Sequence, residues 1–211
     1  MIVHEIFHSI QGESTRAGLP CTFVRLTGCP LRCVYCDTQH AFHEGSAMTV
    51  EEVRREVARL PGRFVTVTGG EPLAQDEVHP LMRSLADDGY DVQLETSGAL
   101  DIAPVDRRVR VILDIKTPGS GMEHRMDWSN LGKLKSGDEV KIVLMSRGDY
   151  QWSAGLLRRG TVPAGVPVLL SPAHGLLDPR DLAAWMTGDG IEARLQLQIH
   201  KYIWGPDCRG V

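Results

Sequence analysis

Three of the five cysteines lie within eight residues of one another: Cys29, Cys33 and Cys36. Their spacing is C-x₃-C-x₂-C, and a fully extended chain would place the first two up to about 14 Å apart. The segment must therefore curl if the three thiolates are to share one centre, and Gly28 and Pro30 are compatible with such a loop. Thiolates are soft ligands that suit both iron–sulfur clusters and zinc.

Two kinds of metal centre are compatible with this spacing. A four-iron cluster usually takes four cysteines, so three would leave one iron open to an outside ligand, as in a catalytic metal site. The alternative is a structural zinc ion with His40 or His43 as the fourth ligand. Structural zinc sites usually have two paired arms of cysteine or histidine, and this segment offers one. The spacing favours the cluster and leaves zinc as the alternative.

Length and composition favour one soluble domain over residues 1–211. Hydrophobic residues make up 42% of the 211 and charged residues 24%, which is ordinary for a globular protein. The net charge of −4 argues against a nucleic-acid partner or a membrane-surface partner, since both usually require a basic face. No apolar run approaches the roughly 20 residues of a membrane span, and no signal peptide follows Met1. We therefore expect a cytoplasmic protein, where clustered cysteines indicate metal binding.

The chain alternates expected strands with expected helices, which favours a parallel sheet. Helices are predicted after the capping box Thr49-Val-Glu-Glu52, over the apolar stripe that begins at Val78, and from Asp178-Pro179. Thr117–Ser129 is polar and contains glycine, so we expect a mobile loop there. Short strands rich in Val, Ile and Leu are predicted at Thr22–Thr27, Phe64–Thr68, Asp91–Glu95, Arg110–Asp114, Glu139–Met145, Val166–Leu170 and Arg194–Gln198.

Polar or reactive residues follow six of these strands. In parallel α/β proteins, ligands bind at the carboxyl ends of the strands, so six such residues together indicate a site. Two fold classes fit this pattern: an open doubly wound sheet, and a complete or partial barrel. The post-strand residues are Gly28-Cys29, Gly69-Gly70-Glu71, Thr96-Ser97-Gly98, Lys116, Ser171-Pro172 and His200.

The cysteine segment resembles the signature of radical S-adenosylmethionine (SAM) enzymes, which also place an aromatic residue, here Tyr35, before the last cysteine. Gly69-Gly70-Glu71-Pro72 follows one helix and one strand later and is similar to the second signature of that superfamily. The resemblance implies a 4Fe–4S cluster whose open iron binds SAM, and a 5′-deoxyadenosyl radical as the reactive species. It makes zinc a remote alternative.

The whole chain resembles one family within that group, the 7-carboxy-7-deazaguanine synthases. The resemblance rests on the segments Glu5-Ile-Phe-His-Ser-Ile-Gln-Gly-Glu13, Phe23–Cys29, Cys36-Asp37-Thr38, Glu95–Gly98, and the tail from Gln198 to Val211. The resemblance implies conversion of 6-carboxy-5,6,7,8-tetrahydropterin to 7-carboxy-7-deazaguanine, with ring contraction and loss of ammonia on the way to queuosine and other deazapurines. It also implies a partial, incomplete barrel with few covering helices, Mg²⁺, a homodimer and an electron donor such as a flavodoxin or ferredoxin.

Site residues follow from the same resemblance. The cluster ligands are Cys29, Cys33 and Cys36, and the implied Mg²⁺ ligand is Thr38. Contacts with SAM are expected from Tyr35, Asp37, Gly70, Glu71, Glu95, Ser97, Asp114, Lys116 and Ser171. Contacts with the pterin are expected from Ile10, Gln11, Gly12, Glu13, Arg25, Thr68 and His200.

Simple chemistry supports several of these roles, and each has a plainer alternative. Arg25 could pair with a substrate carboxylate through two N–H groups, or form an ordinary ion pair. Gln11 and Glu13 offer groups complementary to an aminopyrimidinone edge, or Glu13 caps a local turn. Cys21 is expected to be a buried apolar residue and Cys208 incidental, while His174 has no role that follows from chemistry.

Two positions depart from the family pattern, and another enzyme activity shares its motifs. Asp114-Ile-Lys116 stands where some members have Ser-Pro-Lys, and Ser97 stands where others have Asn. The second hypothesis is a glycyl-radical-enzyme activase, which shares the cysteine spacing and the Gly-Gly-Glu-Pro turn. The Gln11-Gly12-Glu13 opening and the Gln198–Val211 tail argue against it. A zinc-stabilised binding module is the remote third.

Overall fold

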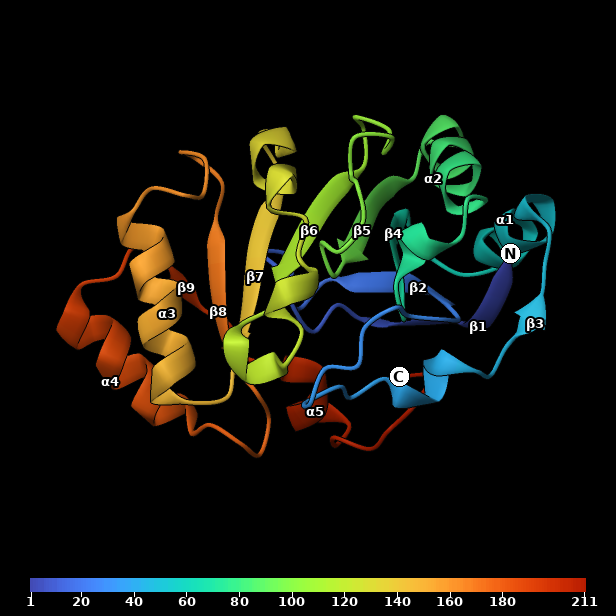
Figure 1. Ribbon diagram of the computed structural model, residues 1–211. Coiled ribbons are helices and arrows are strands. Elements are labelled where there is room, and N and C mark those ends of the chain that lie inside the picture. Colours follow the sequence, from blue (N-terminus) through green and yellow to red (C-terminus); the bar gives the residue numbers. More distant parts are fainter.

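Nine strands form one sheet in the order β3-β1-β2-β4-β5-β6-β7-β8-β9 in a computed structural model that describes residues 1–211 (Figure 1). β1 (Ile2–Ile10) runs antiparallel to both of its neighbours, and the strands from β2 onward are parallel. The first and last strands in this order do not pair with each other, so the curved sheet is open. Strand bounds are β2 Pro20–Leu26, β3 Ser46–Ala47, β4 Phe64–Gly69, β5 Asp91–Thr96, β6 Arg110–Ile115, β7 Glu139–Leu144, β8 Val168–Pro172 and β9 Arg194–Leu195.

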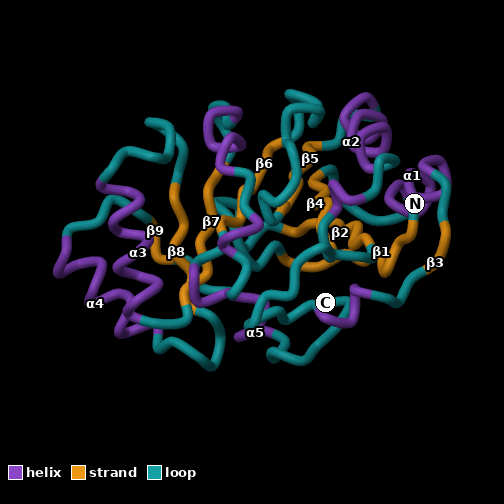
Figure 2. Tube along the Cα trace, viewed as in Figure 1, coloured by secondary structure: helices purple, strands orange, loops and turns teal.

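All the helices except the last gather at the two ends of the sheet, and the segments that join β5, β6 and β7 are loops and short turns (Figure 2). The capping box of Thr49 and Glu52 starts the first helix as expected, and Asp178 with Pro179 starts the fourth. The helices are α1 Val50–Ala58, α2 Val78–Asp87, α3 Arg147–Arg158, α4 Pro179–Asp189 and the short α5 Ile199–Ile203. The partial barrel with few covering helices is confirmed.

One apolar core of 32 residues runs between the sheet and these helices. Every residue of β7 is buried, although Glu139 and Lys141 are charged. A strand covered on both faces is normally a continuous apolar run. The two charges must therefore have partners inside the molecule, and both turn out to face the loop that follows β1.

Several elements differ from the sequence prediction. β1 and α3 were not expected. The apolar and polar residues of β1 come in pairs instead of alternating singly, so β1 lacks the usual strand pattern, and α3 buries small and polar side chains such as Ser153 and Ala154. The last strand ends at Leu195, so His200 lies in α5 and not directly after a strand. Residues 117–129 contain 3₁₀ turns, and a hydrogen bond from Val34 N to Ser120 O ties that segment to the cysteine loop.

Candidate active site

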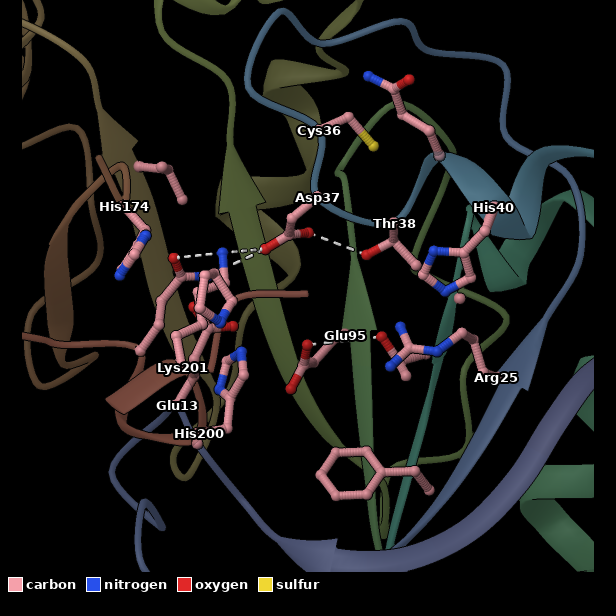
Figure 3. Close-up of a pocket in the computed structure, with 18 of the residues that line it drawn as sticks. Glu13, Arg25, Cys36, Asp37, Thr38, His40, Glu95, His174, His200 and Lys201 are labelled. Carbon is pink, nitrogen blue, oxygen red and sulfur yellow. Dashed lines mark hydrogen bonds and ion pairs between the residues drawn. The ribbon is translucent and has the colours of Figure 1, made fainter. Parts of the chain in front are cut away.

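A cavity of about 630 Å³ lies at the carboxyl ends of the parallel strands. Its wall includes the cysteine loop, the loop after β1, the ends of β4–β7 and the tail from Trp204 to Val211. All the predicted site residues line it except Glu71 and Ser171, which are fully buried. Residues from opposite ends of the chain therefore meet at one site, as the sequence predicted (Figure 3).

Backbone contacts hold the cysteine loop against the glycine turn after β4. The amide N–H groups of Gly70 and Glu71 donate to the carbonyl groups of Leu26 and Gly28, at 3.0 and 2.8 Å. A Cβ at Gly70 would lie 2.1 Å from the Gly28 oxygen and 2.9 Å from the Cys29 Cβ. Only glycine allows this close approach, so the turn sets the position of Cys29.

The three cysteines suit a cluster better than a single ion. Their sulfur atoms do not all lie within 4.8 Å of one another, whereas the sulfurs on one tetrahedral zinc ion would be about 3.8 Å apart, given Zn–S bonds near 2.3 Å. Burial raises the pKa of the Cys29, Cys33 and Cys36 thiols. Bound iron would deprotonate these thiols, since metal coordination deprotonates a coordinating thiol.

Glu71 is buried behind the residues that line the cavity and holds several of them in place. Its carboxylate accepts hydrogen bonds from the Leu73 N–H, the Thr96 hydroxyl, and both the N–H and the hydroxyl of Ser97. Its hydrogen-bonding capacity is thus largely used inside the protein. Glu71 was predicted to contact SAM, but its side chain does not line the cavity. It instead fixes the loop that carries Ser97.

Lys141 on β7 is the main site residue that the sequence did not reveal. Its ammonium group lies 2.8 Å from Glu13 and 3.4 Å from Asp114, and all three side chains are nearly buried. Burial would lower the pKa of Lys141, but Glu13, Asp114 and Glu95 outweigh it and the pKa stands well above the usual value. A lysine among the apolar residues Val140, Ile142 and Val143 was the available signal.

Glu13 is held ionised with one oxygen free. Burial opposes ionisation of Glu13, but the positive charges of Lys141 and of His200 outweigh it, so its pKa lies below the ordinary value. Its Oε2 binds Lys141, and its buried Oε1 has no partner. Buried polar atoms are normally hydrogen-bonded. The free Oε1 therefore marks a place for a donor on a ligand.

Gln11 is fully engaged inside the protein. Its amide nitrogen donates to Thr66 at 3.0 Å and to Glu95 at 3.3 Å, and its amide oxygen accepts from the Glu13 N–H at 3.1 Å. It orders Glu13 and the floor of the cavity, where Thr68 also approaches Glu95 at 3.5 Å. Burial and the Glu13 charge raise the pKa of Glu95 even though Lys141 opposes the shift.

A second set of unpartnered buried oxygens lies near the cysteines. Lys116 pairs with Asp114 at 2.9 Å and lies over the Tyr35 ring, with 5.7 Å between its Nζ and the ring centroid. The Asp114 Oδ1 and the Tyr35 hydroxyl are buried without a hydrogen-bond partner, as is the hydroxyl of Ser171. The sequence assigned all three residues to SAM. The oxygens of Tyr35 and Asp114, which line the cavity, fit a polar ligand at that place.

Arg25 forms the ion pair that was the plainer alternative. Its Nε donates to Glu5 Oε1 at 2.7 Å, and its guanidinium lies 5.7 Å from the Phe7 ring centroid. The pair engages only Nε, which leaves the two terminal nitrogens of Arg25 for a ligand in the cavity. The ion pair and a carboxylate-binding role are therefore compatible.

The C-terminal segment closes the opposite wall. Lys201 on α5 pairs with Asp37, and the Thr38 hydroxyl donates to the other Asp37 oxygen at 2.9 Å. These contacts hold the pKa of Asp37 far below the usual range. The imidazole of His200 packs on Gly12, where a Cβ would lie 1.9 Å from Nδ1. Gly12 thus serves packing as well as any ligand contact.

The remaining cysteines and His174 differ in whether they line the cavity. Cys21 is fully buried beside Thr66, as expected of a small apolar residue. Cys208 is exposed and lines the cavity, and so does His174, which contacts the Tyr202 ring at 5.9 Å between centroids. Lys201 and Glu5 also line the cavity, although the sequence did not predict them as binding residues.

None of the helices has both the length and the apolar character that crossing a membrane requires. Residues 23–123 match the family model of the radical SAM superfamily. The 7-carboxy-7-deazaguanine synthase of Chlorobaculum tepidum is 45% identical, over 99% of this chain and 96% of that protein. The synthase of Koribacter versatilis is 42% identical over the full length of both.

A crystal structure of QueE from Escherichia coli shares the fold, with a TM-score of 0.76 and 24% identity over 93% of this chain and 92% of that one. Full-length identity above 40% with two synthases comes together with a site whose cysteine loop, glycine turn and cavity are all in place. The chain belongs to the 7-carboxy-7-deazaguanine synthase family of radical SAM enzymes.

Proposed function

We propose that this chain converts 6-carboxy-5,6,7,8-tetrahydropterin to 7-carboxy-7-deazaguanine and ammonia. The reaction balances without an external oxidant or reductant, because the nitrogen lost in the ring contraction leaves as ammonia and SAM is regenerated. A cavity of about 630 Å³ lies within the range of small-molecule sites, roughly 300–1,000 Å³. A site of this size, with the tail at its mouth, suits a small heterocycle better than a protein backbone, which argues against the activase.

The observation that carries the proposal is the free, buried Oε1 of Glu13. Lys141 keeps this carboxylate ionised, and an ionised carboxylate only accepts hydrogen bonds. The aminopyrimidinone edge of a pterin offers N–H donors that would satisfy it. Gln11 holds the Glu13 backbone in place, so the acceptor is oriented before the substrate arrives.

Arg25 is suited to the substrate carboxylate. Its terminal nitrogens face the cavity while Glu5 restrains Nε, and a restrained guanidinium binds a carboxylate directionally. Glu13 and Arg25 would thus hold the two polar ends of the pterin. The neutral ring between them would be left beside the position where SAM binds.

The cluster and SAM, when bound, supply the carbon-centred radical that starts the reaction. Cys29, Cys33 and Cys36 would hold the cluster, and the unpartnered oxygens of Tyr35 and Asp114 would contact SAM or its ordered water. The Thr38 hydroxyl and the Asp37 carboxylate offer adjacent oxygen ligands, which is the ligand type that Mg²⁺ prefers. We assign Mg²⁺ to Thr38 on that ground.

The assembly and setting follow from the same family membership. We propose a single domain over residues 1–211, supported by one sheet and one core, in a cytoplasmic homodimer reduced by a flavodoxin or ferredoxin. Tyr202 and Ile203 on α5 and the neighbouring Leu176 are at least half exposed, and such apolar surface is typical of contact regions. Sedimentation of the reconstituted enzyme tests the dimer.

Turnover under anaerobic conditions tests the activity. The reconstituted enzyme is incubated with SAM, a strong reductant and 6-carboxytetrahydropterin, and the product is identified by mass spectrometry. We expect the deazaguanine acid and one ammonia per turnover, with SAM unconsumed. SAM cleavage in the absence of the pterin, with no deazaguanine in its presence, would favour the activase instead.

A further inference from the structure

A second group of metal-binding side chains lies on the cavity wall, apart from the cysteines. His4, Glu5 and His40 each offer one ligand atom, and these atoms lie within 4.8 Å of one another. Glu5 and His40 line the main cavity, and His4 lines the hollow that adjoins it. Figure 3 shows His40 and Arg25 on one side of the site and His200 on the other.

An irregularity in β1 brings two of these ligands together. Neighbouring residues on a strand normally point to opposite faces. In β1, Val3 pairs with Leu26 and Glu5 pairs with Arg25, so His4 is an extra residue opposite no partner. Such a bulge redirects a side chain, and it lets His4 and Glu5 serve the same group.

Each member of the group has a free lone pair. The His4 Nδ1 lies 3.1 Å from the Glu44 carbonyl oxygen, so Nδ1 carries the proton and Nε2 is free. Metal-binding histidines commonly donate their second N–H to a backbone carbonyl in this way. The Nε2 of His40 is buried without a partner. Glu5 uses Oε1 for Arg25 and keeps Oε2 free.

We propose that His4, Glu5 and His40 bind a divalent transition-metal ion at a site separate from the cluster and from Thr38. Two imidazoles and one carboxylate favour Zn²⁺ or Fe²⁺ over Mg²⁺ and Ca²⁺, which prefer oxygen ligands. Three protein ligands leave at least one position open on the ion. Because Glu5 and His40 line the cavity, that position faces the space where a ligand enters.

Zinc binding to the holoenzyme tests the site directly. The cluster-loaded full-length chain is dialysed anaerobically against Zn²⁺ in excess Mg²⁺, and zinc and iron are both counted. We expect one zinc per chain in addition to the cluster iron. His4→Ala and His40→Ala should each weaken zinc binding by at least about 10-fold, with the iron unchanged. His124→Ala is the matched control, because His124 is exposed on another segment and should bind zinc as the wild type does.

X-ray absorption at the zinc edge separates the two possible locations. Histidine and carboxylate ligands give distances of about 2.0–2.1 Å, and cysteine ligands give about 2.3 Å. Sulfur ligands, zinc retained by the His4→Ala/His40→Ala double variant, or no zinc bound by the wild type would overturn the proposal. If His40→Ala loses iron, His40→Gln keeps the side-chain volume and repeats the test. The zinc count does not depend on turnover, so it stands or falls independently of the proposed reaction.

Discussion

The two sides of the cavity are positioned by different kinds of contact. On the cysteine side, backbone hydrogen bonds from Gly70 and Glu71 and the missing Cβ of Gly70 set the loop. On the pterin side, the ion pairs of Lys141 with Glu13 and Asp114 join residues up to 128 positions apart in the chain. The first side depends on local backbone shape, and the second depends on a balance of buried charges.

The largest effect is expected on the cysteine side, from Gly70→Ala. The new Cβ would overlap the Gly28 carbonyl oxygen and push the Cys29 loop away. We expect most of the iron to be lost, and a displacement of about 1 Å to cost roughly 100-fold in turnover. Iron and sulfide analysis measures the first effect. Gly188→Ala is the control, since a Cβ there meets nothing within 4 Å; equal iron loss in both variants would contradict the comparison.

Lys141→Met tests the charge balance on the pterin side. It leaves Glu13 and Asp114 buried without their cation, which typically costs about 3–5 kcal/mol of unfolding free energy. Urea unfolding of the variant and the wild type measures the loss. Arg59→Met removes an exposed surface ion pair with Glu56 and should change stability little. Comparable losses of unfolding free energy in the two variants would show that the buried ion pairs contribute no more to stability than a surface ion pair does.

Glu13→Gln should lower kcat/KM while leaving the cluster intact. Hydrogen bonds to charged groups contribute about 1.5–3 kcal/mol, so we expect roughly a 10- to 100-fold loss for the pterin. Steady-state kinetics at saturating SAM measures it, and iron content serves as the control. Unchanged kinetics would remove Glu13 from the substrate contacts.

The same variant has a defined pH dependence. The native pKa of Glu13 lies below the ordinary value of 4.5, so its ionised form stabilises the fold above that pH. This contribution is lost as the pH falls below 4.5 toward the lower native pKa. The stability difference between wild type and Glu13→Gln should therefore shrink on acidification. A difference that grows instead would reverse the sign of the assigned shift.

The smallest effect is expected from Thr38→Val. The change removes one hydroxyl beside Asp37 and should abolish most of the stimulation by Mg²⁺, with a few-fold lower activity at saturating Mg²⁺. Activity titrations with Mg²⁺ measure the response. A full response in the variant would place the ion elsewhere.

The difference between the two sides also explains which parts were predictable from sequence. Cys29, Cys33, Cys36 and Gly70 could be located because local geometry requires specific residue types at fixed spacing. The parallel strands could be predicted because their apolar runs are short and bounded by turn residues. β1 could not be predicted, because it is only partly buried and its apolar and polar residues come in pairs instead of alternating. α3 could not be predicted because much of its buried face is small and polar.

Lys141 and the Arg25–Glu5 pair show the limit of sequence reasoning more sharply. Their roles depend on which distant residue folds against them, and no spacing in the chain encodes that. The same holds for Glu71, whose motif pointed to SAM but whose carboxylate is occupied by Thr96 and Ser97. Motifs thus identified the site, while tertiary contacts decided how each side chain works in it.

Electron–nuclear double resonance on the reduced cluster with ¹⁵N-labelled SAM measures whether three cysteines leave one iron open for SAM. We expect a ¹⁵N coupling to the cluster that is identical in Cys208→Ser, because Cys208 lines the cavity but is not needed as a ligand. No coupling in the wild type, or loss of the cluster in Cys208→Ser, would contradict it.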